Sequence, residues 1–189
     1  MVAERIPDTP VWTVVSVESV TNCPIGGTVM ITNGRYLMGD AVFTVRRTAD
    51  GFIGYDQKQR LSADAKYASP YLTIVFRRNP KGSSAGSMRV YPVTAGGKDA
   101  QELVRKLEVA FASGSRPLFD SCFLPGQTNG SYNRLLEYVL ARRQEHLSIH
   151  NPVHFVQEKR VNGLLRFSSG RYVELSFAAH TTTTVWYIR

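Results

Sequence analysis

Few side chains in this sequence have the chemistry of nucleophiles or metal ligands. The chain holds two cysteines, Cys23 and Cys122, and neither belongs to a C-x-x-C pair that would indicate a zinc or redox site. Two ordinary reduced thiols are expected instead. No G-x-S-x-G elbow supports Ser-His-Asp chemistry. The residue types therefore predict a protein that is not an enzyme and needs no cofactor.

The histidines His146, His150 and His154 recur every four residues. On a continuous helix that spacing would place imidazoles on one face, as in metal-binding pairs. Pro152 interrupts such a helix, and no acidic or cysteine ligand stands at motif spacing. We therefore predict no metal site.

The basic residues form the strongest signal. The net charge is +8, and ten basic residues against four acidic ones lie between Arg35 and Arg89, which predicts that most of the net charge sits on the N-terminal β module. A polyanionic partner is expected: a phosphorylated lipid head group, a nucleic acid or an acidic protein. The candidate ligand-binding residues are Arg46, Arg47, Lys58, Arg60, Arg77 and Arg78. A solvated basic surface without a ligand is the alternative.

Neighbouring residues on a strand point to opposite faces. At most one of Arg46 and Arg47 can therefore face a given site, and the same holds for Arg77 and Arg78. Three aromatic residues lie near these cations in the sequence, Phe52, Tyr55 and Tyr71. They are compatible with stacking on unpaired bases, which keeps an RNA-binding or ribonucleoprotein scaffold subunit as the alternative function.

The elements that must position these residues are mostly β-strands. Short β-branched or alternating segments at 11–20, 28–32, 35–38, 41–47, 51–55, 71–78 and 88–93 predict an antiparallel barrel or sandwich. Apolar residues at spacings of three and four, including Leu103, Leu107 and Phe111, then predict an amphipathic helix over 99–112. Asp99 and Glu102 are its expected N-terminal cap, and Gly114 its stop. A second helix over 132–144 and a β meander over 153–188 follow.

Several of these segments resemble the PH-GRAM domain of myotubularins, within the pleckstrin-homology superfamily. Residues 23–36 (CPIGGTVMITNGRY) are similar to the family's GRAM signature, and residues 88–91 and 107–111 are similar to its late strands and closing helix. The resemblance covers residues 11–143. It implies an α+β fold with a PH-like barrel or sandwich closed by the helix over 1–113, a connector with a second helix over 114–152, and a small C-terminal β appendage over 153–189.

The catalytic loop of that family requires a cysteine with an arginine six positions later. Val29 and Thr128 stand at those positions after the two cysteines. The resemblance thus implies a non-catalytic membrane-recruitment or interaction module that binds a phosphoinositide head group or a protein partner. Another alternative is the front part of a phosphoinositide phosphatase whose catalytic part lies elsewhere. The first residues resemble no targeting peptide and no apolar run reaches membrane-spanning length, so we expect a cytoplasmic, peripheral membrane protein without a transmembrane span.

Overall fold

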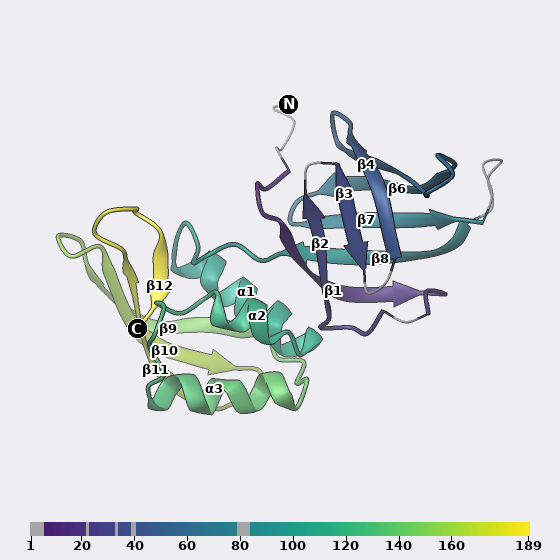
Figure 1. The fold of residues 1–189 in the computed structure, drawn as a ribbon. Coiled ribbons are helices and arrows are strands. Elements are labelled where there is room, and N and C mark those ends of the chain that lie inside the picture. The colour runs from purple at the N-terminus through teal and green to yellow at the C-terminus, as the bar shows by residue number, and fades with distance from the viewer. Residues whose placement is uncertain (1–5, 22, 33, 39–40, 79–83) are drawn as a thin grey trace. The chain divides into compact units, whose positions relative to one another are not determined.

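The computed structural model describes residues 6–21, 23–32, 34–38, 41–78 and 84–189 (Figure 1). Contacts divide the chain into two compact units, Met1–Val93 and Thr94–Arg189. Asn33-Gly34, between the strands expected at 28–32 and 35–38, has the sequence of a tight hairpin turn, but Asn33 lies outside the described residues.

The first unit is a closed barrel of eight strands. Each strand pairs antiparallel with the next, and β8 returns to pair with β1, so the ring has no free edge. The strands are β1 (Val11–Glu18), β2 (Thr28–Thr32), β3 (Arg35–Met38), β4 (Ala41–Arg47), β5 (Gly51–Tyr55), β6 (Leu61–Ala68), β7 (Tyr71–Arg77) and β8 (Ser84–Pro92).

Alternate residues of these strands fill the barrel. Trp12, Val29, Leu72 and Ile74 are at most 1% exposed, because strand alternation turns every second side chain inward. The ring of Tyr36 packs among aromatic neighbours, with centroid distances of 5.7 Å to Phe43, 6.1 Å to Phe52 and 6.5 Å to Phe76. Burying each large apolar side chain contributes about 1.5–3 kcal/mol, so this cluster is a main source of barrel stability.

The start of β5 requires a glycine. A Cβ atom on Gly51 would lie 1.7 Å from the carbonyl oxygen of Ala65 on β6. The two backbones can approach this closely only because Gly51 has no side chain. The close approach fixes the position of the turn that joins β4 to β5.

The second unit contains three helices and a four-stranded antiparallel sheet of order β12-β11-β10-β9. Its elements are α1 (Ala100–Ser113), α2 (Arg116–Asp120), α3 (Gly130–Leu140), β9 (Leu147–Phe155), β10 (Arg160–Phe167), β11 (Tyr172–Ala179) and β12 (Trp186–Ile188). The backbone N–H of Glu102 donates a 2.7 Å hydrogen bond to Asp99 Oδ1, and Gly114 ends α1 in the left-handed region at φ 71°. Both expected ends of this helix are confirmed.

One face of this sheet packs against the helices. Phe167 of β10 lies with its ring centroid 4.7 Å from Tyr138 of α3 and 6.3 Å from Phe111 of α1. Leu165 and Phe177 on the same face are fully buried. The core of this unit therefore lies between its sheet and α1 and α3.

The coarse fold class is confirmed: mostly antiparallel β structure with a barrel, a second small sheet and few helices. The expected boundaries at 1–113, 114–152 and 153–189 differ from the observed division after Val93. We expected the amphipathic helix to close the barrel, but α1 packs on α2, α3, β9 and β12. The apolar residues at spacings of three and four show that one face of α1 is buried, but they do not identify the elements against which it packs.

Three local predictions also needed correction. The strand β6 lies in a segment for which the sequence predicted no element, and the short helix α2 lies in the connector, where only the helix over 132–144 was expected. The second helix ends at Leu140 rather than at residue 144, and Pro152, which was expected to interrupt a helix, lies inside β9.

Candidate functional site

A cleft of about 600 Å³ lies on the outer surface of the barrel over β5, β6 and β7. Its polar lining is formed by Thr48, Asp50, Asp64, Lys66, Thr73 and Arg77. These β6 and β7 residues alternate with Ala63, Ala65, Leu72 and Ile74, which are buried in the barrel, so their side chains point outward.

One basic residue of this cleft is neutralised within the protein. Arg77 Nε donates a 2.5 Å hydrogen bond to Asp64 Oδ2, and the two side chains are about 30% exposed. The Arg77–Asp64 pair forms a wall of the cleft and leaves the carboxylate unavailable to Lys66.

Lys66, Thr73 and Arg89 form a second feature, which we name the basic row. Thr73 of β7 pairs with Lys66 of β6 on one side and Arg89 of β8 on the other. Adjacent strands lie about 4.8 Å apart, so the Cα atoms of Lys66 and Arg89 are about 10 Å apart. The Arg89 guanidinium carbon lies 4.2 Å from the centroid of the Tyr71 ring, which orients it. Within the described part of the chain, no carboxylate pairs with Lys66 or Arg89.

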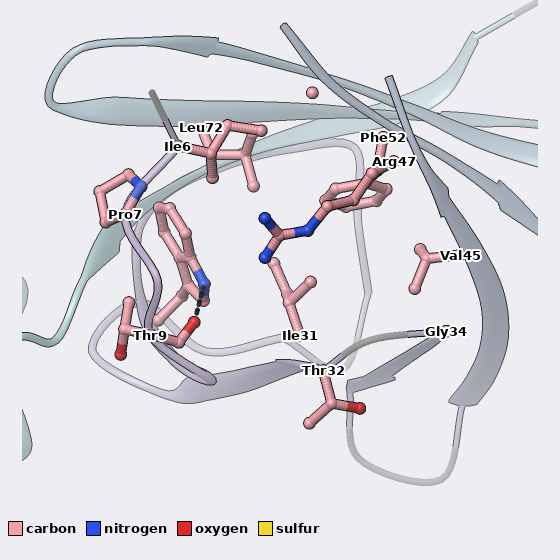
Figure 2. Close-up of a pocket in the computed structure, with 12 residues that line it drawn as sticks. Ile6, Pro7, Thr9, Ile31, Thr32, Gly34, Val45, Arg47, Phe52 and Leu72 are labelled. Carbon is pink, nitrogen blue, oxygen red and sulfur yellow. Dashed lines mark hydrogen bonds between the residues drawn. The ribbon is translucent and has the colours of Figure 1, made fainter. Parts of the chain in front are cut away.

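Arg46 and Arg47 point to opposite sides of the barrel wall. Arg46 pairs with Ile53, whose next partner is the outward-facing Asp64, so Arg46 belongs to the outer surface. Arg47 pairs with the buried Phe52, and Figure 2 shows its guanidinium pointing into a pocket at one end of the barrel. Arg47 also lies 3.9 Å from Asp8 Oδ1.

The pocket that Arg47 enters measures about 30 Å³ (Figure 2). A cavity of this size has room for a few water molecules at most, so the pocket is too small for a phosphorylated head group. Trp12 in its lining donates a 3.2 Å hydrogen bond to the carbonyl oxygen of Thr9. This pocket is part of the packing at the barrel end.

Lys58 and Arg60 lie in the turn between β5 and β6, at the opposite end of β5 from Arg47. Arg60 Nε donates a 2.8 Å hydrogen bond to Asp56 Oδ2. The backbone N–H groups of Lys58 and Arg60 each donate a 2.9 Å bond to Asp56 Oδ1. The hydrogen bond from the Arg60 backbone, followed by that from its side chain, holds the pKa of Asp56 below its usual value. Arg60 is thus engaged in stabilising its own turn.

The six predicted cations therefore do not form one site. Arg47, Arg60 and Arg77 each face a carboxylate. Arg46, Lys58 and Arg78 are exposed, on β4, in the β5–β6 turn and after β7. Of the six, Arg77 lines the outer cleft, and Arg46 faces outward on the strand beside it. The basic row was not predicted, because its signal is strand alternation combined with a register that the sequence alone does not reveal.

The cysteines lack the environment of catalytic nucleophiles. Burial raises the pKa of the Cys23 thiol, and complete burial raises that of Cys122 to about 11. A reactive cysteine needs the opposite shift. Among the described residues no group of three histidine, cysteine or acidic side chains could hold a metal ion.

The charge distribution corrects one expectation. Residues 1–93 carry eleven basic and seven acidic residues, and residues 94–189 carry twelve and eight, a net charge of +4 in each unit. The acidic residues before Arg35 offset part of the barrel's charge. Both units are therefore equally basic.

The chain matches no protein-family model, no curated protein and no solved structure. The resemblance to the PH-GRAM domain therefore rests on the sequence motifs alone. In the portion that the structure describes, no helix is both long and apolar enough to span a bilayer.

Proposed function

We propose that the barrel is a non-catalytic binding module for a phosphoinositide head group, held at the basic row. The observation that carries this proposal is the placement of two cations, Lys66 and Arg89, on either side of Thr73, neither of which pairs with a carboxylate among the described residues. The sequence motifs shared with PH-GRAM domains favour a lipid head group over other phosphorylated ligands.

The three side chains supply complementary interactions with a phosphate. Arginine offers paired N–H donors in a fixed plane, lysine a compact positive charge, and threonine a hydroxyl donor. The ring of Tyr71 supports the guanidinium of Arg89 and so reduces the entropy lost when it binds. The outer cleft next to Lys66 gives the remainder of a head group a place to lie.

A binding role without catalysis agrees with the cysteines. Both thiols are buried with raised pKa values, and neither has an arginine six residues later. We expect no phosphate release from a phosphoinositide substrate. Turnover that disappears in Cys122→Ser would contradict this part of the proposal.

Vesicle binding tests the site directly. The full chain is mixed with phosphatidylcholine vesicles with and without a few per cent of a phosphatidylinositol phosphate, and binding is measured by co-sedimentation. Lys66→Glu combined with Arg89→Glu should weaken binding by at least about a hundredfold, because each cation near an anionic surface contributes about 1 kcal/mol and reversal adds repulsion.

Two double reversals with the same change in net charge serve as controls. Arg142→Glu with Arg143→Glu alters the second unit and should reduce binding much less. Lys58→Glu with Arg60→Glu alters a turn in which Arg60 already faces Asp56, and an intermediate loss is expected. Equal losses in all three variants would show unspecific charge attraction and overturn the assignment of the basic row.

A further inference from the structure

The sheet of the second unit has one face that the helices do not cover. Its outward residues follow from the register: Arg166 lies between Ser148 and Tyr172, Leu164 between His150 and the exposed Glu174, and Asn162 between Val153 and Ser176. Tyr172 is 48% exposed and Val153 is 55% exposed. These residues alternate with the buried Val161, Leu165 and Val173, so the uncovered face is solvent-accessible over three strands.

Aromatic rings and an arginine gather at one end of this face. The rings of His150 on β9 and Tyr172 on β11 lie 5.9 Å apart between centroids, although β10 separates their strands. Arg166 is exposed beside Tyr172 and has no carboxylate partner within the described residues. Flat exposed rings next to a free guanidinium offer a base a stacking surface and its phosphate a counter-charge.

A second aromatic group lies at the other end. Arg160 pairs with Phe155 on β9, and its guanidinium carbon lies 4.3 Å from the centroid of that ring. Tyr187 of β12 lies on the same face, two strands away across Ala178. The Arg160 guanidinium also forms a 3.1 Å salt bridge with Glu158 Oε2.

A polar pair separates the two aromatic groups. Ser176 Oγ donates a 2.8 Å hydrogen bond to Asn162 Oδ1, which orients the amide and leaves its two N–H donors for another acceptor. The distance along β10 from Arg160 to Arg166 is about 20 Å at 3.3 Å per residue, the length of a few nucleotides. Base edges between the stacked ends would meet the amide of Asn162.

From this arrangement we infer that the uncovered face of the second sheet binds a single-stranded nucleic acid. Bases stack on Tyr172 and His150 at one end and on Tyr187 and Phe155 at the other. Arg166 neutralises a phosphate, and the +4 net charge of this unit favours the encounter. The site is distinct from the basic row and does not depend on the function proposed for the barrel.

The residues inferred here to stack on bases differ from those first considered, which were Phe52, Tyr55 and Tyr71. Phe52 is 5% exposed inside the barrel, and the Tyr71 ring carries the guanidinium of Arg89. Phe52 therefore offers no ring to a base, and Tyr71 contacts Arg89 of the basic row. The exposed rings of β9 and β11 are the ones that offer a stacking surface.

Fluorescence anisotropy with labelled ten-nucleotide RNA and DNA strands of mixed sequence tests the inference on the full chain at physiological salt. Tyr172→Ala removes a ring without changing the charge, and we expect it to weaken binding at least tenfold. Tyr172→Phe keeps the ring and should bind within twofold of the wild type. The RNA and DNA arms show which sugar the face accepts.

Several outcomes would overturn the inference. The first is that the wild type binds neither the RNA nor the DNA oligonucleotide. The second is that Tyr172→Ala binds as tightly as the wild type and has the same melting curve. The third is that the protein forms a concentration-dependent dimer that Tyr172→Ala abolishes. Lys66→Glu with Arg89→Glu should leave nucleic-acid binding within threefold, and Tyr172→Ala should leave vesicle binding unchanged. A loss of both activities in both variants would place a single site elsewhere and contradict this assignment.

Discussion

Lys106 Nζ donates a 2.6 Å hydrogen bond to the carbonyl oxygen of Gly96, within a side chain that is only 1% exposed. The same ammonium group donates a 2.5 Å bond to the carbonyl oxygen of Thr94. A buried charge is tolerated here because two backbone acceptors replace its water. Lys106 thereby anchors the segment before α1 to the helix itself.

Replacing Lys106 by methionine keeps the apolar stem and removes the charge and both donors. Two carbonyl groups then lose partners, at a cost of about 1–3 kcal/mol each, which exceeds the gain from removing the charge. We expect Lys106→Met to lower the melting temperature of the second unit at pH 7, measured by circular dichroism. An unchanged melting temperature would show that the two bonds contribute nothing net.

The pH dependence of the same variant has a definite sign. Burial holds the pKa of Lys106 below its ordinary value of 10.5, so the unfolded chain binds the proton more tightly than the folded one. Protonation of Lys106 therefore costs stability below its folded pKa, and this cost is relieved as the pH rises toward 10.5. The stability difference between wild type and Lys106→Met should widen in favour of the wild type from pH 7 to 10.

Leu107→Asp should unfold the second unit and leave the barrel folded. Leu107 is fully buried on α1, and an unpaired carboxylate there costs several kcal/mol. Each unit holds one tryptophan, Trp12 in the barrel and Trp186 in β12, so Trp186→Phe in the same background leaves fluorescence that reports the barrel. Simultaneous loss of the Trp12 signal would show that α1 stabilises the barrel after all.

Cys122 should be inert to alkylating reagents until the second unit unfolds. Its pKa of about 11 exceeds the ordinary value of 9.0, so the stability it contributes is complete below pH 9 and lost as the pH rises toward 11. The shift corresponds to roughly 3 kcal/mol. Cys122→Ala should reduce the loss of stability that occurs as the pH rises from 9 toward 11. An equally steep loss in the variant would show that another group causes it.

Gly51→Ala should destabilise the barrel by several kcal/mol or prevent it from closing. The new methyl group would meet the carbonyl oxygen of Ala65 at 1.7 Å, and both partners are backbone that cannot rotate away. Gly130→Ala at the start of α3 is the matched control, since a Cβ there has no neighbour within 4 Å. Equal melting temperatures for the two variants would mean that β5 and β6 can move apart locally without loss of stability.

Local chemistry explains which parts of the fold were predictable. The Asp99 cap and the Gly114 stop of α1 depend on neighbouring residues only, and both were found. The strand β6 (LSADAKYA) was missed because alanine, aspartate and lysine have low strand propensity. Its inward residues Ala63 and Ala65 are small, as the crowded barrel interior and the nearby Gly51 require. Only the neighbouring strands reveal that requirement.

The candidate sites depend on register and were therefore harder to predict. Alternation correctly separated Arg46 from Arg47, because that rule acts within one strand. The basic row joins residues 66, 73 and 89, and the pairings that unite them extend over three strands. Likewise, the rings of His150 and Tyr172 approach each other across β10. The four-residue spacing of the histidines in the sequence gives no indication of this contact.

The pairing of β1 with β8 has a consequence for the growing chain. Trp12 faces Pro92, eighty residues later, whereas the other barrel strands pair with their immediate successors. A nascent chain can thus form seven hairpin ladders in succession while β1 and its latest strand still expose unpaired N–H and C=O groups. Such edges recruit strands from other molecules. Fragments that end before β8 should therefore aggregate. The pairing of β8 with β1 is the step that removes both exposed edges.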